Sequence, residues 1–166
     1  MVYVDNDPMV PAHGRALLAV NERTAVVTSD LRDPAAILGD EAVKRLIDFD
    51  RPVGVMLVGI LHHLHDDEDP RGIVEAYMAA VPSGSHLFIT HFCDSSQDSR
   101  DAEKKFLALL GTGRFRTVAE ITAFFEGYDL VEPGVVPLPL WRPEADLPEE
   151  LTVGRRLMFG GIARKP

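Results

Sequence analysis

The stretch "VYVDNDP", residues 2–8, decides how the chain is to be interpreted. Three strand-forming residues, Val2 to Val4, are followed at once by a polar cluster that ends in Pro8. This pattern is typical of a β-strand that ends in a loop and leads into a helix. Such a unit usually lies in the middle of an α/β domain. We therefore expect the chain to begin after the opening strand of its domain.

Strands and helices alternate downstream of this stretch. Apolar residues at helical spacing predict a helix over 8–20, and the continuous apolar run 53–61 predicts a strand buried on both faces. Further strands are expected at 25–28, 85–92, 129–136 and 156–163, and helices at 34–48 with a break near Gly39, 70–81, 98–110 and 118–125. This order predicts a single α/β domain over residues 1–166, with a parallel core.

Five of the aspartates near the starts of the expected helices and the ends of the expected strands need an explanation. Asp7, Asp33 and Asp69 each precede a proline, which predicts that they cap the helices that follow. Asp5 and Asp30 come earlier, at the carboxyl ends of two expected strands, and no cap explains them.

Carboxyl ends of parallel strands are where α/β sheets bind ligands. The carboxylate of Asp5 can accept hydrogen bonds from the two vicinal hydroxyls of a ribose. Asp30 could accept from the exocyclic amine of an adenine while Leu31 packs on the ring. The pair therefore predicts a nucleoside site, and the alternative that both acids are ordinary turn residues stays open.

Several longer stretches strengthen this prediction, namely "VYVDNDPMV", "VVTSDLRDPAAIL", "DFDRPVGVMLVGILHHL", "VPSGSHLFITH", "ITAFFEGYDLVEPGVVPLPLWRP" and "GGIARKP". Through them the chain resembles the S-adenosylmethionine-dependent methyltransferases of the Rossmann-like class, and within that class the actinobacterial S-adenosyl methyltransferase family. The resemblance implies a Rossmann-like, mostly parallel sheet with helices on both faces and an antiparallel strand pair near the C-terminus. It also implies S-adenosylmethionine as cofactor and a small-molecule methyl acceptor.

The cofactor-binding residues that the resemblance implies are Asp5, Asn6, Asp30, Leu31, Val58 and Gly59. Asp5 would hold the ribose, Asn6, Asp30 and Leu31 would lie beside the adenine, and the other two would lie beside the methionine moiety. No catalytic residue follows, because in-line methyl transfer mostly requires a positioned nucleophile, and any base depends on the acceptor.

Members of this family carry a first strand and a glycine-rich turn of the "DIGTG" type before the stretch that opens this chain. The one Gly-x-Gly here, Gly111 to Gly113, follows an expected helix, so it cannot form that turn. We therefore expect a truncated domain that lacks the first strand, through a late start or a shortened chain. Unpaired edges on the strands at 2–4 and 53–61 would favour a homo-oligomer.

The stretch "HHLHDDEDP", residues 62–70, suggests a different chemistry. Histidines with carboxylates suit zinc, which makes a metal-dependent hydrolase on the His62–Asp69 loop an alternative. Adjacent histidines in an extended segment point to opposite faces, so we predict a strand-to-helix loop and no metal site. His62, His63, His91 and Trp141 are instead candidates for the acceptor pocket, although a buried, hydrogen-bonded histidine would explain His91 equally well.

Composition limits the partners. A formal charge of −9 repels phosphate backbones, so nucleic acid is not expected as a partner. The longest apolar run is far shorter than a bilayer span, and one cysteine fits a reducing compartment, so we expect a cytoplasmic protein that acts away from membranes. Besides the methyltransferase and the hydrolase, a third alternative is a non-catalytic remnant or oligomerising module of the methyltransferase fold.

Overall fold

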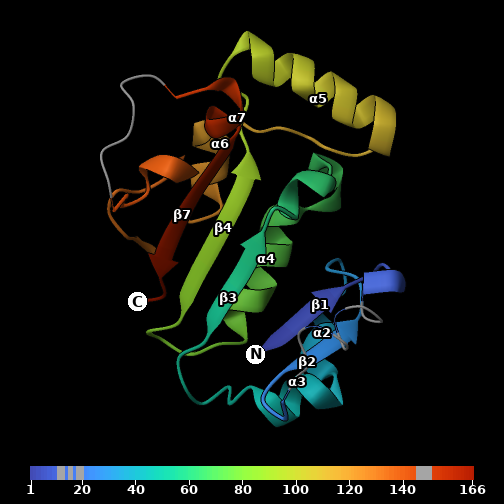
Figure 1. Ribbon diagram of the computed structural model, residues 1–166. Helices are drawn as coiled ribbons and strands as arrows, with labels where there is room; N and C mark the ends of the chain where they lie inside the picture. The colour runs from blue at the N-terminus through green and yellow to red at the C-terminus, as the bar shows by residue number, and fades with distance from the viewer. Residues whose placement is uncertain (11–13, 15–16, 18–20, 145–150) are drawn as a thin grey trace. The chain divides into compact units, whose positions relative to one another are not determined.

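The computed structural model describes residues 1–10, 14, 17, 21–144 and 151–166 (Figure 1). These residues form two compact units, one of Met1–Val53 with Gly72–Pro82 and one of Gly54–Arg71 with Ser83–Pro166. The units are described separately below as the first and the second unit. The expectation of a single domain stays a prediction.

The first unit contains a two-stranded parallel sheet of β1 (Val2–Asp5) and β2 (Ala25–Thr28), as predicted. Two short helices follow, α2 (Pro34–Gly39) and α3 (Glu41–Leu46). The expected break between them falls at Asp40, whose carboxylate accepts from the backbone N–H groups of Ala42 and Val43 and so caps α3.

Two of the three predicted caps are confirmed. The Asp7 carboxylate accepts from Met9 N at 2.8 Å, and the Asp33 carboxylate accepts from Ala36 N at 2.9 Å. Asp69 has a φ of +50° and ends a 3₁₀ turn, and its predicted cap of the helix that follows stays a prediction. The predicted helix over 8–20 lies largely outside the described residues.

The second unit is built on a five-stranded mixed sheet in the order β3 (Gly54–Val58), β4 (His86–Phe92), β7 (Met158–Arg164), β5 (Asp129–Leu130), with β6 (Val136–Pro137) also paired to β7. β3 and β4 are parallel, and β7 runs antiparallel to its neighbours. This arrangement confirms the parallel core and the antiparallel strands near the C-terminus.

Two strand predictions in this unit need correction. β3 is shorter than the expected strand 53–61 and is not buried on both faces, because Met56 and Val58 are 58% and 54% exposed while Leu57 between them is buried. The expected strand 129–136 is divided into β5 and β6, because a turn at Glu132 and Pro133 separates them.

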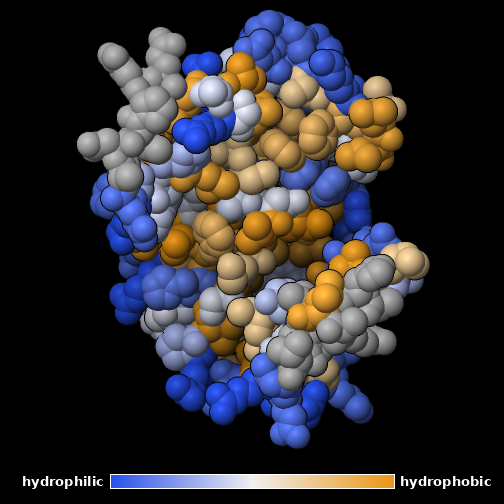
Figure 2. All heavy atoms as spheres, in the orientation of Figure 1, coloured by the Kyte–Doolittle hydropathy of each residue, from blue (hydrophilic) through white to orange (hydrophobic). Residues whose placement is uncertain are grey.

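The remaining elements are α4 (Pro70–Ala79), which joins the two units along the chain, α5 (Gln97–Leu110), α6 (Val118–Ala123), α7 (Val153–Arg156) and the 3₁₀ turns η1 (Leu61–His63), η2 (Asp66–Glu68) and η3 (Leu138–Leu140). In the core of the second unit, Leu87, Ile89 and Ile121 are fully buried. Hydrophobic side chains also lie at the surface (Figure 2), and on α5 they include Leu109 and Leu110.

The strand edges bear on the expected truncation. Among the described residues, β1 pairs only with β2, and β3 pairs only with β4 and has no partner on its other side. The expected truncation stays a prediction. Within the described ranges, no helix is both long enough and apolar enough to cross a membrane.

The close packing of β7 against β4 gives a stability prediction. A Cβ added at Gly160 would lie 2.5 Å from Leu138 Cδ2 and 3.1 Å from the backbone oxygen of Ile89. We expect Gly160→Ala to lower the free energy of unfolding by about 1–3 kcal/mol through overpacking, as measured by denaturant unfolding. Gly54→Ala is the control, because nothing lies within 4 Å of its added Cβ. Equal unfolding midpoints for the two variants would contradict this packing.

Candidate functional site

The first unit brings three of the predicted binding residues together. Asp5 ends β1, Asn6 follows it, and Asp30 comes just after β2. Because the two strands are parallel and in register, with Asp5 opposite Thr28, their carboxyl ends lie side by side. The side-chain amide of Asn6 donates to Asp30 Oδ2 at 3.3 Å and links the two ends.

Both carboxylates also make local hydrogen bonds, as the alternative of ordinary turn residues predicts. Asp5 Oδ1 accepts from Asp7 N at 2.9 Å, and Asp30 Oδ1 accepts from Arg32 N at 2.9 Å. Each is a side-chain-to-backbone turn of the kind that aspartate commonly makes. No described residue donates to the other oxygen of Asp5, which leaves that atom as an acceptor for a ligand.

Asp30 is more fully engaged than Asp5. The Arg32 guanidinium lies 3.2 Å from its Oδ1, and Asn6 donates to its Oδ2. The backbone hydrogen bond from Arg32 does most to lower the pKa of this carboxyl, with smaller contributions from Asn6 and the guanidinium. Asp30 is therefore ionised at neutral pH, and a ligand amine would share oxygens that already accept from protein groups.

Leu31 is held by a residue that the sequence pattern did not indicate. The hydroxyl of Tyr77, on the part of α4 that belongs to the first unit, donates to the backbone oxygen of Leu31 at 3.1 Å. Burial raises the pKa of Tyr77 to about 12, so the hydroxyl keeps its proton. A tyrosine among the apolar positions of the expected helix 70–81 was the only available signal, and it did not indicate a partner 46 residues away.

In the second unit, Val58 ends β3 and Gly59 turns the chain out of the strand. Gly59 has a φ of +59°, a conformation that glycine adopts at little cost. Its N–H donates to Thr90 Oγ1 at 2.8 Å and also lies 3.2 Å from the backbone oxygen of Thr90. Thr90, on β4, thus fixes the end of β3, a role that its sequence context did not predict.

His62 and His63 form part of η1, directly after this turn. His62 is 3% exposed, its Nδ1 has no hydrogen-bond partner among the described residues, and burial lowers its pKa to about 3. The ring of His63 lies 4.2 Å from that of His62, and its Nδ1 is 2.8 Å from Thr112 Oγ1. Both histidines thus lie close to the predicted cofactor residues of the same unit, Val58 and Gly59.

His91 and Trp141 are in different situations. His91 is fully buried, and its Nδ1–H donates to the backbone oxygen of Phe92 while its Nε2 accepts from Arg116. The buried, hydrogen-bonded alternative therefore accounts for His91 without an acceptor molecule. The ring of Trp141 lies under the guanidinium of Arg142 at 4.9 Å, and its buried Nε1 has no partner among the described residues. The place of Trp141 in an acceptor pocket stays a prediction.

The metal-site alternative receives no support. Among the described residues, no three His, Cys, Asp or Glu side chains are arranged to hold a metal ion. Asp66, which follows the histidines, instead accepts from Arg116 at 2.7 Å, and this hydrogen bond holds the pKa of its carboxyl below the usual value.

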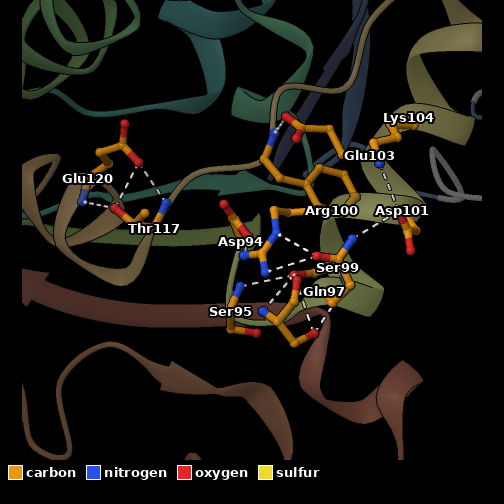
Figure 3. A network of polar contacts seen from close by, with 12 residues as sticks. Asp94, Ser95, Gln97, Ser99, Arg100, Asp101, Glu103, Lys104, Thr117 and Glu120 are labelled. Carbon is orange, nitrogen blue, oxygen red and sulfur yellow. Dashed lines mark hydrogen bonds and ion pairs between the residues drawn. The ribbon is translucent and has the colours of Figure 1, made fainter.

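A polar network surrounds the segment after β4 (Figure 3). The carboxylate of Asp94 pairs with Arg100 at 3.0 Å. Ser96 caps α5 by accepting from Ser99 N, and Thr117 and Glu120 form a capping box at the start of α6. These contacts fix where α5 and α6 begin, near the carboxyl end of β4.

The model of the S-adenosyl methyltransferase family matches residues 1–166. The chain belongs to this family. This membership confirms the family named from the sequence stretches and the methyltransferase-like α/β fold that the two sheets and their helices form.

Solved structures agree with the assignment. A protein of Thermobifida fusca described as a candidate methyltransferase is 46% identical, with a TM-score of 0.93, and the match covers 99% of this chain and 62% of that one. A DUF574 family protein of Streptomyces avermitilis is 35% identical, with a TM-score of 0.89, over 99% and 64% of the two chains. The N-methyltransferase NodS of Bradyrhizobium japonicum, in complex with S-adenosylhomocysteine, shares the fold at 12% identity and a TM-score of 0.61, over 99% and 66%.

This chain of the methyltransferase family is shorter than the two actinobacterial relatives. It spans less than two thirds of the Thermobifida and Streptomyces chains. No curated protein matches it. The roles of its individual residues stay predictions.

The buried histidines give a pH prediction. The pKa is about 3 for folded His62 and about 4 for folded His91, against about 6.5 in the unfolded chain. Below pH 6.5 the unfolded chain takes up protons that the folded chain does not, so stability falls as pH decreases toward 4. Between pH 7.5 and 5 each histidine should cost about 2 kcal/mol of unfolding free energy.

His62→Phe tests this, because it keeps an aromatic ring and removes the titrating group. Denaturant unfolding at the two pH values should show a smaller loss of stability for this variant than for the wild type. The matched control is His86→Gln, which changes an exposed histidine of β4 and should leave the loss unchanged. A loss of the same size in all three proteins would mean that His62 is not the responsible group.

Proposed function

We propose that this chain forms the greater part of an S-adenosylmethionine-dependent methyltransferase that acts on a small-molecule acceptor. Family membership supports the reaction class. The observation that carries the proposal is the grouping of Asp5, Asn6 and Asp30 at the carboxyl ends of β1 and β2, linked by the Asn6–Asp30 hydrogen bond. This is where a parallel α/β sheet binds a nucleoside.

The residues of the first unit fit the nucleoside half of the cofactor. The hydrogen bond from Asp7 N orients the Asp5 carboxylate and leaves its second oxygen for a ribose hydroxyl. Asn6 and the ionised Asp30 present an amide and a carboxylate to the adenine, and Leu31 would pack on the ring. In the second unit, Val58 and Gly59 would contact the methionine moiety, because they end the parallel strand β3.

When bound, the cofactor supplies an electrophilic methyl group on a sulfonium centre. The task of the protein is then to bind, to orient the acceptor in line with the methyl group and to exclude water. His62, His63 and Trp141 are the residues that we place near the acceptor. No catalytic residue is assigned, since any base depends on the acceptor, whose identity the geometry does not specify.

We further propose that a glycine-rich turn outside these 166 residues completes the cofactor site, as the greater length of the two close relatives suggests. Gly111, the first glycine of the Gly-x-Gly in this chain, ends α5 with a φ of +70° and has the role of a helix C-cap. The expectations of a cytoplasmic location, of self-association and of no nucleic-acid partner remain part of this proposal.

Asp5→Asn tests the site most selectively, because asparagine can still accept from Asp7 N but loses the charge. A charge-assisted hydrogen bond to a ligand hydroxyl is worth about 1.5–3 kcal/mol, so S-adenosylhomocysteine should bind roughly 10 to 150 times more weakly. Asp7→Ala is the control and should cost about 1 kcal/mol of stability through its lost cap, with little change in affinity. Titration calorimetry and thermal unfolding measure the two effects.

The outcomes separate the alternatives. Reversed effects would mean that the roles of Asp5 and Asp7 are exchanged. Zinc binding without nucleoside binding would favour the hydrolase. The absence of any nucleoside binding, in this chain and in an extended one, would favour a non-catalytic module.

The proposed completion of the site makes a prediction about chain length. The 166-residue chain should bind S-adenosylhomocysteine more weakly than a fusion that adds an upstream strand and a glycine-rich turn of the "DIGTG" type, since only the fusion would carry that turn. Calorimetry on both proteins measures the difference. A fusion that carries the same turn with alanines in place of its glycines is the control, and equal affinity in all three proteins would contradict the proposed completion.

A further inference from the structure

Arg116 is the one Lys, Arg, Asp or Glu side chain in the described part of the chain that is almost fully buried, at 3% exposed. It lies between α5 and α6, next to the end of β4. Its N–H donates to the backbone oxygen of Phe92 at 3.3 Å, and its own oxygen accepts from Asp94 N at 2.9 Å. These bonds form a short parallel bridge with Cys93 and fix the backbone of Arg116 beside β4.

The guanidinium reaches from there to the loop after β3. Nη1 donates to the backbone oxygen of Leu61 at 3.1 Å and to His91 Nε2 at 2.9 Å. Nη2 donates to the backbone oxygen of Leu64 at 3.0 Å and to Asp66 Oδ1 at 2.7 Å. Both terminal nitrogens thus donate to the loop after β3, which lies 50–55 residues earlier in the chain, and Nη1 also donates to the adjacent strand β4.

A lysine could not make this set of contacts. Its single ammonium is a point donor, whereas the planar guanidinium presents its N–H groups in a fixed fork. His91 is part of the same geometry, because its Nδ1–H donates to Phe92 and leaves Nε2 bare to accept from Arg116. Burial favours this neutral form, since it lowers the pKa of His91 to about 4.

The loop that Arg116 holds includes His62 and His63 and begins directly after Gly59. We propose that Arg116 is the positioning residue of the cofactor and acceptor site in the second unit, setting the Gly59–Asp66 segment against the end of β4 through the carbonyls of Leu61 and Leu64. This inference rests on the proposed function, because it assigns Arg116 a role in ligand binding that goes beyond stability.

Arg116→Lys is the test variant, with two controls. Arg100→Lys makes the same chemical change at an exposed ion pair. Ile121→Val lowers stability in the buried core of the same unit without touching the Arg116 contacts. Three quantities are measured in each protein: the S-adenosylhomocysteine dissociation constant by NMR titration, hydrogen exchange of the 61–66 amides, and the ¹⁵N shift of His91 Nε2.

We expect Arg116→Lys to bind S-adenosylhomocysteine at least tenfold more weakly, to exchange the 61–66 amides faster and to shift the His91 Nε2 signal. The two controls should match the wild type in affinity and in the His91 signal, and should exchange the 61–66 amides no faster than their change in overall stability explains. Unchanged affinity and unchanged exchange in Arg116→Lys would overturn the inference. If the lysine variant does not fold, the ¹⁵N spectrum of the wild-type protein tests the hydrogen bond from Arg116 to His91. A His91 protonated on Nε2 would exclude this bond, and a bare, hydrogen-bonded Nε2 would support it.

Failure of the proposed function gives a different result. A wild-type protein that does not bind S-adenosylhomocysteine would overturn the proposed function and the ligand-binding half of this inference. Hydrogen exchange of the 61–66 amides and the ¹⁵N signal of His91 Nε2 would still show whether Arg116 holds the loop.

Discussion

In each unit, the backbone groups that follow a strand are no longer paired by the neighbouring strand, and side chains have to satisfy them. After β1, the Asp5 carboxylate accepts from the backbone two residues on. After β3, Thr90 accepts from Gly59 N, and Arg116 donates to the carbonyls of Leu61 and Leu64. The candidate residues of each unit depend on these contacts, because they determine the path of the chain as it leaves the strand.

The same contacts separate atoms that serve the fold from atoms that remain for a ligand. Asp5 uses one oxygen on its own turn, whereas Asp30 has both oxygens engaged by Asn6 and Arg32. His91 uses both ring nitrogens inside the protein. Asp5 is therefore the stronger candidate for a ligand contact, and His91 is better understood as part of the support behind η1.

Local sequence patterns predicted the features that depend on neighbours in the chain. The strands β1 and β2, the divided helix around Asp40 and the caps at Asp7 and Asp33 all follow from residues within a few positions of one another. The interval 129–136 was predicted as one strand because its apolar residues did not indicate the division at Pro133.

Contacts between distant segments were not predictable in this way. Tyr77 with Leu31, and Arg116 with Leu61, join residues 46 and 55 positions apart. A buried arginine cannot be distinguished from an exposed one by its own sequence neighbours, so its partners become known only when the fold brings them together. The family stretches predicted Asp5, Asn6 and Asp30 as a group, and the parallel register of β1 and β2 explains why they are close.

The central claim is that the carboxyl ends of β1 and β2 bind the nucleoside half of the cofactor. It is tested most directly by titrating the ¹⁵N-labelled protein with S-adenosylhomocysteine and following its backbone amides. The account predicts that the signals of Asp5, Asn6 and Leu31 shift together and fit a single dissociation constant. Shifts confined to other segments, or none at millimolar ligand, would contradict it.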